Sequence, residues 1–390
     1  MTASRSGAPP HIADRTGLIL GGGGARASYQ VGALKALAEI VPTGRQAPFP
    51  IICGASAGAI NATVLAAYAR DFHEGVRRLV GVWENFTTDK VFRKSASATL
   101  ARLFRWGSAL VLGGGNPLNP MSVLDNRPLR NLTERHIPFE RVQQALDQGL
   151  LRALCVTACS YTTGHSVSFF QAQEAATPWA RARRVGCRHR ITIDHLMAST
   201  AIPLIFPAVC LRGEFFGDGS MRQTAPISPA IHLGARKILI LGVRREYGVS
   251  LDTDSEAPLY PGLGQISGYV LDTLFLNSLR ADLERLQRIN KTLSLLPTTE
   301  RGKTPLRPIK TLLISPSQDI AEIALRHQSA LPQSVKYLLY LLGARRGSGR
   351  RLMSYLLFEQ PFCRALIDLG YRDALAQRDE IVDFLNDAAP

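Results

Sequence analysis

The chain has 390 residues, of which 46% are hydrophobic and 20% charged, a balance that fits a folded globular protein and excludes a disordered or fibrous one. No low-complexity linker divides it, so we expect one large unit with extensions. The net charge of +15, from 46 Lys and Arg against 31 Asp and Glu, favours contact with a polyanion such as nucleic acid or an anionic membrane.

The N-terminal residues 1–16 contain Pro9 and Pro10 but no apolar run, so they predict a flexible tail rather than a secretory signal. This favours a cytoplasmic location, with peripheral contact at a membrane. An uncharged stretch at residues 46–69 is long enough to cross a bilayer, but its prolines and glycines are atypical of a membrane helix. We expect it to form a strand, a turn and a buried helix.

Two strand-loop-helix units come first in the chain. The apolar residues 18–20 lead into Gly21–Gly24 and then into a helical pattern around residues 31–38. Residues 49–53 predict a second strand, residues 54–58 a tight turn, and residues 59–69 a helix rich in small residues. Consecutive units of this kind predict a parallel sheet covered by helices, and therefore an α/β fold.

Later segments extend this pattern. Short apolar runs predict strands at residues 153–158, 167–170, 237–243 and 309–315, and leucines at helical spacing predict a core-packing helix over residues 268–290. After residue 315 we expect helices only, at residues 320–328, 335–342, 352–358 and 380–385. We therefore divide the chain into a tail (1–16), a core (17–247) and a mostly helical C-terminal region (248–390) with a strand near residues 309–315.

The strongest local signal is Gly54-Ala55-Ser56-Ala57-Gly58, a G-x-S-x-G pattern between a predicted strand and a predicted helix. Glycines on both sides allow a sharp turn that exposes the serine hydroxyl, with the helix N-terminus beneath it. The alternative is an ordinary tight turn. The strand-turn-helix context favours a nucleophile at Ser56.

A second signal is Gly21-Gly22-Gly23-Gly24-Ala25-Arg26, again between a strand and a helix. Backbone N–H groups in such a loop can bind either a cofactor phosphate or the oxyanion of a tetrahedral intermediate. A dinucleotide site requires an acidic residue after the next strand, which instead runs into the serine turn. A P-loop requires a following Lys-Ser or Lys-Thr, which is absent. We favour an oxyanion hole.

A third signal is Asp218-Gly219, preceded by Gly217. Alone it would indicate a plain turn. Flanking glycines also let a carboxylate lie close to another backbone, as a base beside Ser56 must.

Together these motifs resemble the patatin-like phospholipase family. The resemblance implies a three-layer α/β/α fold with a mostly parallel central sheet, and a C-terminal helical extension typical of long bacterial members. It implies an oxyanion hole at Gly22, Gly23, Gly24 and Arg26, a nucleophile elbow at Gly54 and Gly58, and a dyad of Ser56 and Asp218. Residues 198–207 are similar to the family segment before the aspartate. Ala27 and Ser220 stand where the family usually has glycine, which bears on rate and substrate fit.

The resemblance also implies an activity. Asp218 accepts the Ser56 proton, the serine attacks a fatty acyl ester, and water releases the acid, as in phospholipase A or lysophospholipase enzymes. Burial beside Phe206, Phe215 or Phe216 would raise the pKa of Asp218 and improve it as a base. Lipid esters and an anionic membrane surface are the expected partners, nucleic acid is not favoured, and no metal or organic cofactor is implied.

Three other interpretations stay open. The chain could transfer acyl groups to lipid acceptors, or it could be a non-catalytic membrane-binding protein with a vestigial site. It could also use a Ser-His-Asp triad as in α/β-hydrolases, because His232 and His327 both follow Asp218. Ser56 lies too early in the chain for that fold's usual elbow. The basic clusters at 181–190 and 345–351 fit either a membrane contact or a solvated surface.

Overall fold

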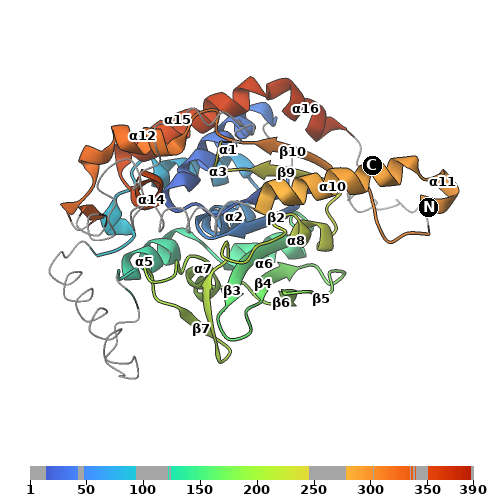
Figure 1. Ribbon diagram of the computed structural model, residues 1–390, viewed down its shortest axis with the longest axis horizontal. Helices are drawn as coiled ribbons and strands as arrows, with labels where there is room; N and C mark the ends of the chain where they lie inside the picture. Colours follow the sequence, from blue (N-terminus) through green and yellow to red (C-terminus); the bar gives the residue numbers. More distant parts are fainter. Residues whose placement is uncertain are drawn as a thin grey trace, which may run out of the picture.

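The central layer is a ten-stranded sheet with helices on both faces, which confirms the expected α/β/α fold (Figure 1). The computed structural model describes residues 15–42, 48–93, 122, 124–245, 278–301, 303–333, 335–336, 339 and 350–387. Five neighbouring strands of the sheet are parallel. In spatial order they are β10 (Lys310–Ile314), β9 (Lys237–Leu241), β1 (Thr16–Leu20), β2 (Ile51–Ala55) and β3 (Ala153–Ser160).

The other half of the sheet is built from shorter strands, several of them antiparallel to their neighbours. β4 (Ser166–Ala172) pairs antiparallel with β3, and its other edge binds β6 (Arg184–Arg188) and then β5 (Trp179–Arg181). β7 (Val209–Leu211) and β8 (Glu214–Asp218) form a hairpin, and β8 pairs antiparallel with the end of β3. The sheet is therefore mixed but mostly parallel at its centre.

Alternating side chains of the parallel strands build one core on each face of the sheet. On one face, Leu18 and Leu20 pack with apolar residues of three helices that follow the first strands: α1 (Ser28–Ile40), α2 (Ala57–Ala67) and α3 (Phe72–Trp83). On the other face, Ile19 packs with α8 (Ser228–His232) and α10 (Ser278–Leu295). The four inner parallel strands, β1, β2, β3 and β9, are thus buried on both sides, as is usual for parallel sheets.

The C-terminal helices are part of the first of these layers. They are α12 (Ile320–Arg326), α14 (Arg350–Leu356), α15 (Gln360–Ala376) and α16 (Arg378–Asn386). In Figure 1, α12, α15 and α16 follow the upper edge and α14 lies below α12. α15 lies directly on α1, because a Cβ on Gly32 would stand only 1.9 Å from the Ile367 carbonyl oxygen. The buried Lys237 ammonium donates to carbonyls at the end of α16. The proposed boundary at residue 248 stays a prediction, but β10 and α15 pack into the core.

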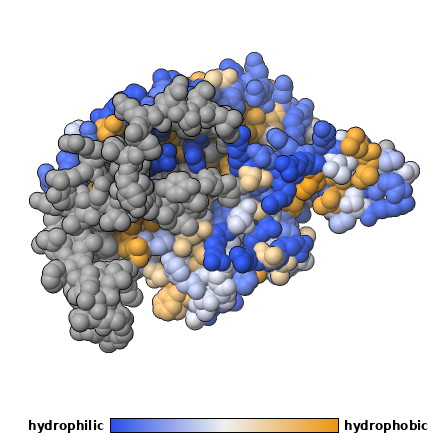
Figure 2. Space-filling view, in the orientation of Figure 1, coloured by the Kyte–Doolittle hydropathy of each residue, from blue (hydrophilic) through white to orange (hydrophobic). Residues whose placement is uncertain are grey.

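The remaining described helices are short. They are η1 (Gly24–Ala27), η2 (Thr88–Lys90), α5 (Arg127–His136), α6 (Glu140–Asp147), α7 (Ile193–Ser199), α11 (Thr298–Arg301) and η3 (Gln328–Ala330). Figure 2 shows apolar residues near the outer end of α10, where Leu295 is 77% exposed. Parts of the predicted tail and of the helices at 268–290 and 335–342 lie outside the described residues.

Two strands meet head to head along one edge of β3. β2 runs parallel to β3 and ends at Ala55, which is opposite Thr157. β8 runs antiparallel to β3 and ends at Asp218, which is opposite Ala158, the next residue of β3. The carboxyl ends of β2 and β8 therefore face each other, and the residues that follow or end these strands are brought together.

Candidate active site

Ser56 lies in a sharp turn between β2 and α2. Its backbone has φ 53° and ψ −133°, a conformation that non-glycine residues rarely adopt and that is typical of strained functional turns. The turn is also very tight. A Cβ on Gly58 would stand 2.3 Å from the Leu20 carbonyl oxygen, and one on Gly54 would stand 2.5 Å from the Gly58 carbonyl oxygen. Both glycines of the G-x-S-x-G pattern are thus required by the close approach of strand and helix.

The Ser56 hydroxyl donates a hydrogen bond of 2.6 Å to Oδ2 of Asp218. The other carboxylate oxygen, Oδ1, accepts the backbone N–H of Ser220 at 2.9 Å. Asp218 is fully buried and Ser56 is 2% exposed. Both oxygens of the carboxylate thus have a donor, and one of these donors is the hydroxyl that the sequence predicted as a nucleophile.

Burial raises the pKa of Asp218 from 3.8 to about 6, although the hydrogen bonds from Ser56 and Ser220 oppose this shift. The direction agrees with the expectation from the sequence. Phe206 and Phe216 are buried, and Phe216 lies on the same side of β8 as Asp218. Phe215 was wrongly expected to help bury the carboxyl group, because its side chain points to the other side of β8 and is 51% exposed.

The glycine loop passes next to this pair. A Cβ on Gly22 would stand 2.1 Å from the Ser220 hydroxyl and 2.8 Å from Cβ of Ser56, so only glycine fits between them. Gly24 has φ +55° and lines the same cavity as Ser56. The loop therefore lies where its N–H groups could meet a substrate, but its role as an oxyanion hole stays a prediction.

Arg26, the last residue of the glycine motif, extends its side chain toward the C-terminal region. Its Nε donates to the Ser354 hydroxyl at 2.8 Å, and its guanidinium lies 4.0 Å from the centre of the Tyr355 ring. A second nitrogen donates to the Arg351 carbonyl at 3.3 Å. These contacts hold the glycine loop against α14. Participation of Arg26 in the oxyanion hole stays a prediction.

The two histidines that could complete a triad, His232 and His327, contact aromatic rings outside the proposed dyad. His232 stacks on Trp179 with 4.8 Å between ring centres, and His327 contacts the edge of Phe362. Within the described part of the chain, no histidine hydrogen-bonds to Ser56 or Asp218. The geometry therefore favours direct transfer of the serine proton to the carboxylate.

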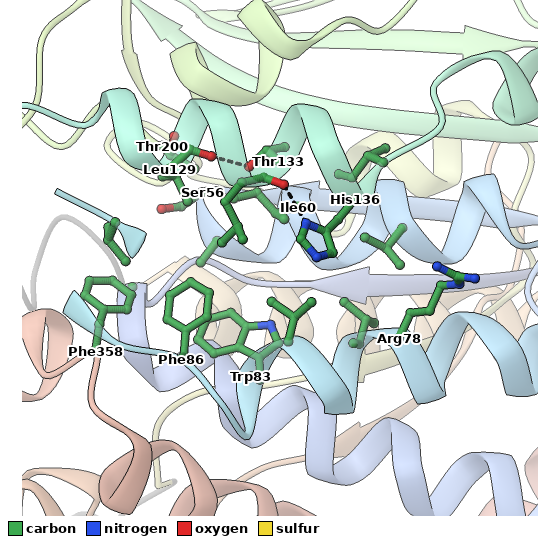
Figure 3. Close-up of a pocket in the computed structure, with 18 of the residues that line it drawn as sticks. Ser56, Ile60, Arg78, Trp83, Phe86, Leu129, Thr133, His136, Thr200 and Phe358 are labelled. Carbon is green, nitrogen blue, oxygen red and sulfur yellow. Dashed lines mark hydrogen bonds between the residues drawn. The ribbon is translucent and has the colours of Figure 1, made fainter. Parts of the chain in front are cut away.

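A narrow apolar channel begins at Ser56. Its volume is about 70 Å³, and its walls come mainly from α2, α3 and α5. Figure 3 shows Ser56, Thr200 and Phe358 toward one end, and His136 and Arg78 toward the other. Most of the other lining side chains are apolar, and they include Ile60, Val64, Leu79, Val82, Trp83, Phe86, Leu129, Leu132 and Ile137. Such a lining suits hydrocarbon rather than a polar group.

Comparison with known families identifies the chain. The sequence model of the patatin-like phospholipase family matches residues 18–231, more than half of the 390 residues. The chain belongs to the patatin-like phospholipase family. The match starts in β1 and ends in α8, so it contains Ser56, Asp218 and the glycine loop. Membership in this family supports lipid ester hydrolysis in general terms.

Solved structures of two other proteins resemble this patatin-like chain. VipD from Legionella pneumophila has 13% identity and a TM-score of 0.35, over 94% of this chain and 67% of VipD. Human GIVD cytosolic phospholipase A2, in complex with methyl gamma-linolenyl fluorophosphonate and terbium chloride, has 11% identity and a TM-score of 0.42. That alignment covers 97% of this chain and 60% of the human chain. No curated protein sequence matches the chain.

Several residues at this patatin-like site were not found from the sequence. Phe358 lies in a segment predicted as a helix but not assigned to the site, and α3 and α5 were not predicted at all. For α3 the sequence does contain a signal, because Asp71 is a residue type that often caps the start of a helix. In the structure its side chain accepts the Glu74 N–H at 2.9 Å. Ser199 was noted only as part of a family-like segment.

The described residues also bear on metals and membranes. No cluster of His, Cys, Asp or Glu in them could hold a metal ion. None of the helices in the described ranges is both long and apolar enough to cross a bilayer. All six cysteines lie in these ranges, and each is free.

Proposed function

We propose that this protein is a lipid acyl hydrolase of the phospholipase A or lysophospholipase type, with Ser56 as nucleophile and Asp218 as base. The observation that carries the proposal is the 2.6 Å hydrogen bond between Ser56 Oγ and Asp218 Oδ2, beside an apolar channel that begins at Ser56. The hydrogen bond supplies proton transfer, and the channel supplies a place for an acyl chain.

In the first half of the reaction, Ser56 Oγ attacks the carbonyl carbon of the ester while its proton moves to Oδ2 of Asp218. The carbonyl oxygen becomes an oxyanion, which backbone N–H groups of Gly22–Gly24 stabilise. The C–O bond to the alcohol then breaks. The alkoxide takes the proton from Asp218, and the acyl group stays on Ser56 as an ester.

In the second half, water attacks the acyl-enzyme and gives one proton to Asp218. The bond between Ser56 Oγ and the acyl carbon breaks, and the proton returns to Ser56. The products are a free fatty acid and the starting enzyme. A pKa of about 6 suits Asp218 for both halves, because the group is ionised at neutral pH yet basic enough to accept a proton.

We also propose peripheral contact with an anionic membrane. Arg181 and Arg183 are exposed on the β5–β6 hairpin, and the net charge of the chain is +15. Not every arginine of that cluster is free for lipid. Arg188 donates to four backbone carbonyls, and Arg190 pairs with Glu140. Contact would therefore come from the tip of the hairpin and weaken with salt.

The test is a panel of phospholipids, lysophospholipids and triglycerides in vesicles with and without anionic lipid, with released fatty acids identified by mass spectrometry. We expect release by the wild type and none by Ser56→Ala. A faster reaction on anionic vesicles, reversed by salt, supports the membrane contact. Fatty acid release by well-folded Ser56→Ala would contradict the assignment, and transfer of the acyl group to a lipid alcohol would identify a transacylase instead.

A further inference from the structure

The carboxyl end of α7 contacts both halves of the proposed dyad. The Ser199 hydroxyl accepts the backbone N–H of Ser56 at 2.9 Å and donates to the Thr157 carbonyl at 2.6 Å. The Ser199 carbonyl accepts the Gly219 N–H at 3.1 Å, and the Ala201 carbonyl accepts the Asp218 N–H at 2.9 Å. Ser199 itself is fully buried. Ser199 and Ala201 thus bind the turn of Ser56 and the strand end of Asp218.

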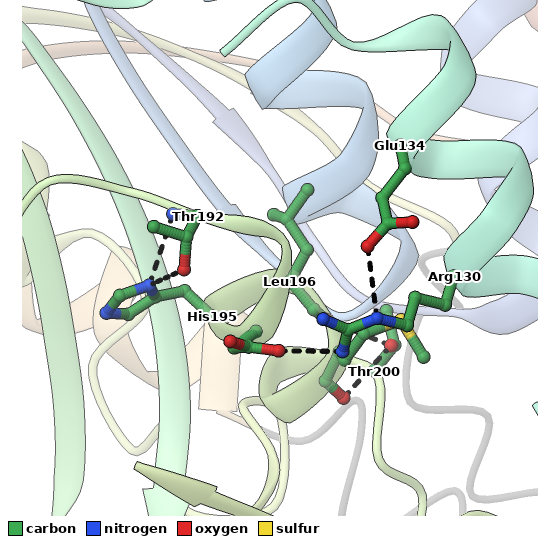
Figure 4. A network of polar contacts seen from close by, with 8 residues as sticks. Arg130, Glu134, Thr192, His195, Leu196 and Thr200 are labelled. Carbon is green, nitrogen blue, oxygen red and sulfur yellow. Dashed lines mark hydrogen bonds and ion pairs between the residues drawn. The ribbon is translucent and has the colours of Figure 1, made fainter. Parts of the chain in front are cut away.

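The other end of α7 is firmly anchored. Thr192 and His195 form a capping box, and Arg130 on α5 donates to the Asp194 carboxylate at 2.7 Å (Figure 4). Burial lowers the pKa of His195 to about 4, so its ring stays neutral at physiological pH and Nδ1 remains an acceptor for Thr192. A helix fixed at its start gives Ser199 a defined position at its end.

We propose that Ser199 is a positioning residue that holds Ser56 in its strained turn and at the correct distance from Asp218. This proposal rests on the proposed function of the dyad. The φ of 53° at Ser56 is costly for a residue with a side chain, so neighbouring contacts must maintain it. The hydrogen bond from the Ser56 N–H is such a contact, because it binds the backbone of the strained residue itself.

The same bond also bears on where the oxyanion is held. The Ser56 N–H points to the Ser199 hydroxyl and is therefore not directed at a substrate carbonyl. Donors for the oxyanion must come from other groups, and Gly24 and Ala57 line the cavity next to Ser56. Ser199 thus orients the nucleophile and leaves charge stabilisation to the neighbouring N–H groups.

The experiment measures the rate at which a fluorophosphonate labels Ser56, and peptide mass spectrometry locates the label. Because the probe replaces the substrate, the natural lipid need not be known. Ser199→Ala removes the hydroxyl. Ser199→Cys keeps nearly the same volume but replaces oxygen by a weakly hydrogen-bonding thiol. Ser168→Ala is the matched control, because it removes a buried hydroxyl 3.4 Å from the Thr157 side chain without touching the Ser56 turn.

We expect both Ser199 variants to lose about 10- to 100-fold in the maximal labelling rate, with half-saturating probe concentration within about threefold of wild type. Ser168→Ala should label at the wild-type rate. Wild-type labelling by folded Ser199→Cys would overturn the positioning role, because packing alone would then suffice. If Ser199→Ala does not fold, Ser199→Cys decides. A wild type that is not labelled at Ser56 would instead refute the proposed function, and this assignment with it.

Discussion

The Asp218 carboxylate accepts a hydrogen bond directly from the Ser56 hydroxyl, although 162 positions separate the two residues in the chain. The contact follows from the way β2 and β8 share one edge of β3. Ala55 and Asp218 lie opposite consecutive residues of that strand, so the turn after Ala55 carries Ser56 to the carboxylate. The hydroxyl and the carboxylate are thus in direct contact, as the proposed dyad requires.

Histidine should be dispensable for activity. His232 stacks on Trp179 and His327 contacts Phe362, so neither ring is placed to accept the serine proton. We expect His232→Gln and His327→Gln to keep kcat/KM within about tenfold of wild type, a change of ~1.4 kcal/mol that altered packing can cause. Near-complete loss in either variant, with a normal melting temperature, would indicate a triad.

The pH dependence of activity should report Asp218. Because burial raises its pKa to about 6, the carboxyl group is protonated below that pH and cannot accept the serine proton. We expect kcat/KM to rise with pH through about 6 and to level off above it. A profile measured from pH 4.5 to 8 on a substrate that does not itself titrate is sufficient. A flat profile over this range would mean that the base is a group with a lower pKa.

The channel should determine which acyl chains are cleaved. Ile60 follows Ser56 by one turn of α2 and lines the channel, so Ile60→Trp should block it just beyond the nucleophile. We expect the ratio of hydrolysis rates for long over short acyl esters to fall at least tenfold. Ile231→Trp, at an exposed position of α8, is the control. Equal losses on long and short esters would place the acyl chain elsewhere.

The contact between Arg26 and α14 should matter for turnover. Ser354→Ala removes the hydroxyl that accepts from Arg26 Nε, and loss of a buried hydrogen bond of this kind costs about 1–3 kcal/mol. We expect a lower melting temperature and turnover reduced about tenfold, because the glycine loop rests on this contact. Ser294→Ala, an exposed serine on α10, should change neither. Unchanged turnover in Ser354→Ala would show that the loop is held without α14.

The local parts of this site could be predicted from residue patterns, whereas the long-range pairing of Ser56 with Asp218 was implied only by the resemblance to a family. Gly54 and Gly58 identify the turn of Ser56 because strand, turn and helix are adjacent in the chain. The pairing of Asp218 with that turn depends on the register of β8 on β3, which no local pattern specifies. The same holds for Phe358 and for α15, whose place against the core depends on contacts with helices hundreds of residues away.

Turnover of a lipid ester by Asp218→Asn tests the central claim most directly. The variant should be folded. Because its pKa is raised, the charged Asp218 carboxylate destabilises the native state above pH 6. Relative to a group with pKa 3.8, the cost is about 3 kcal/mol, and it disappears below pH 4, where the carboxyl group is protonated in both the folded and the unfolded state. At pH 7.5 the asparagine should therefore not lower the free energy of unfolding. We predict that kcat of the Asp218→Asn variant falls by ~10²–10⁴-fold or more. Activity within tenfold of wild type would contradict the Ser56–Asp218 dyad.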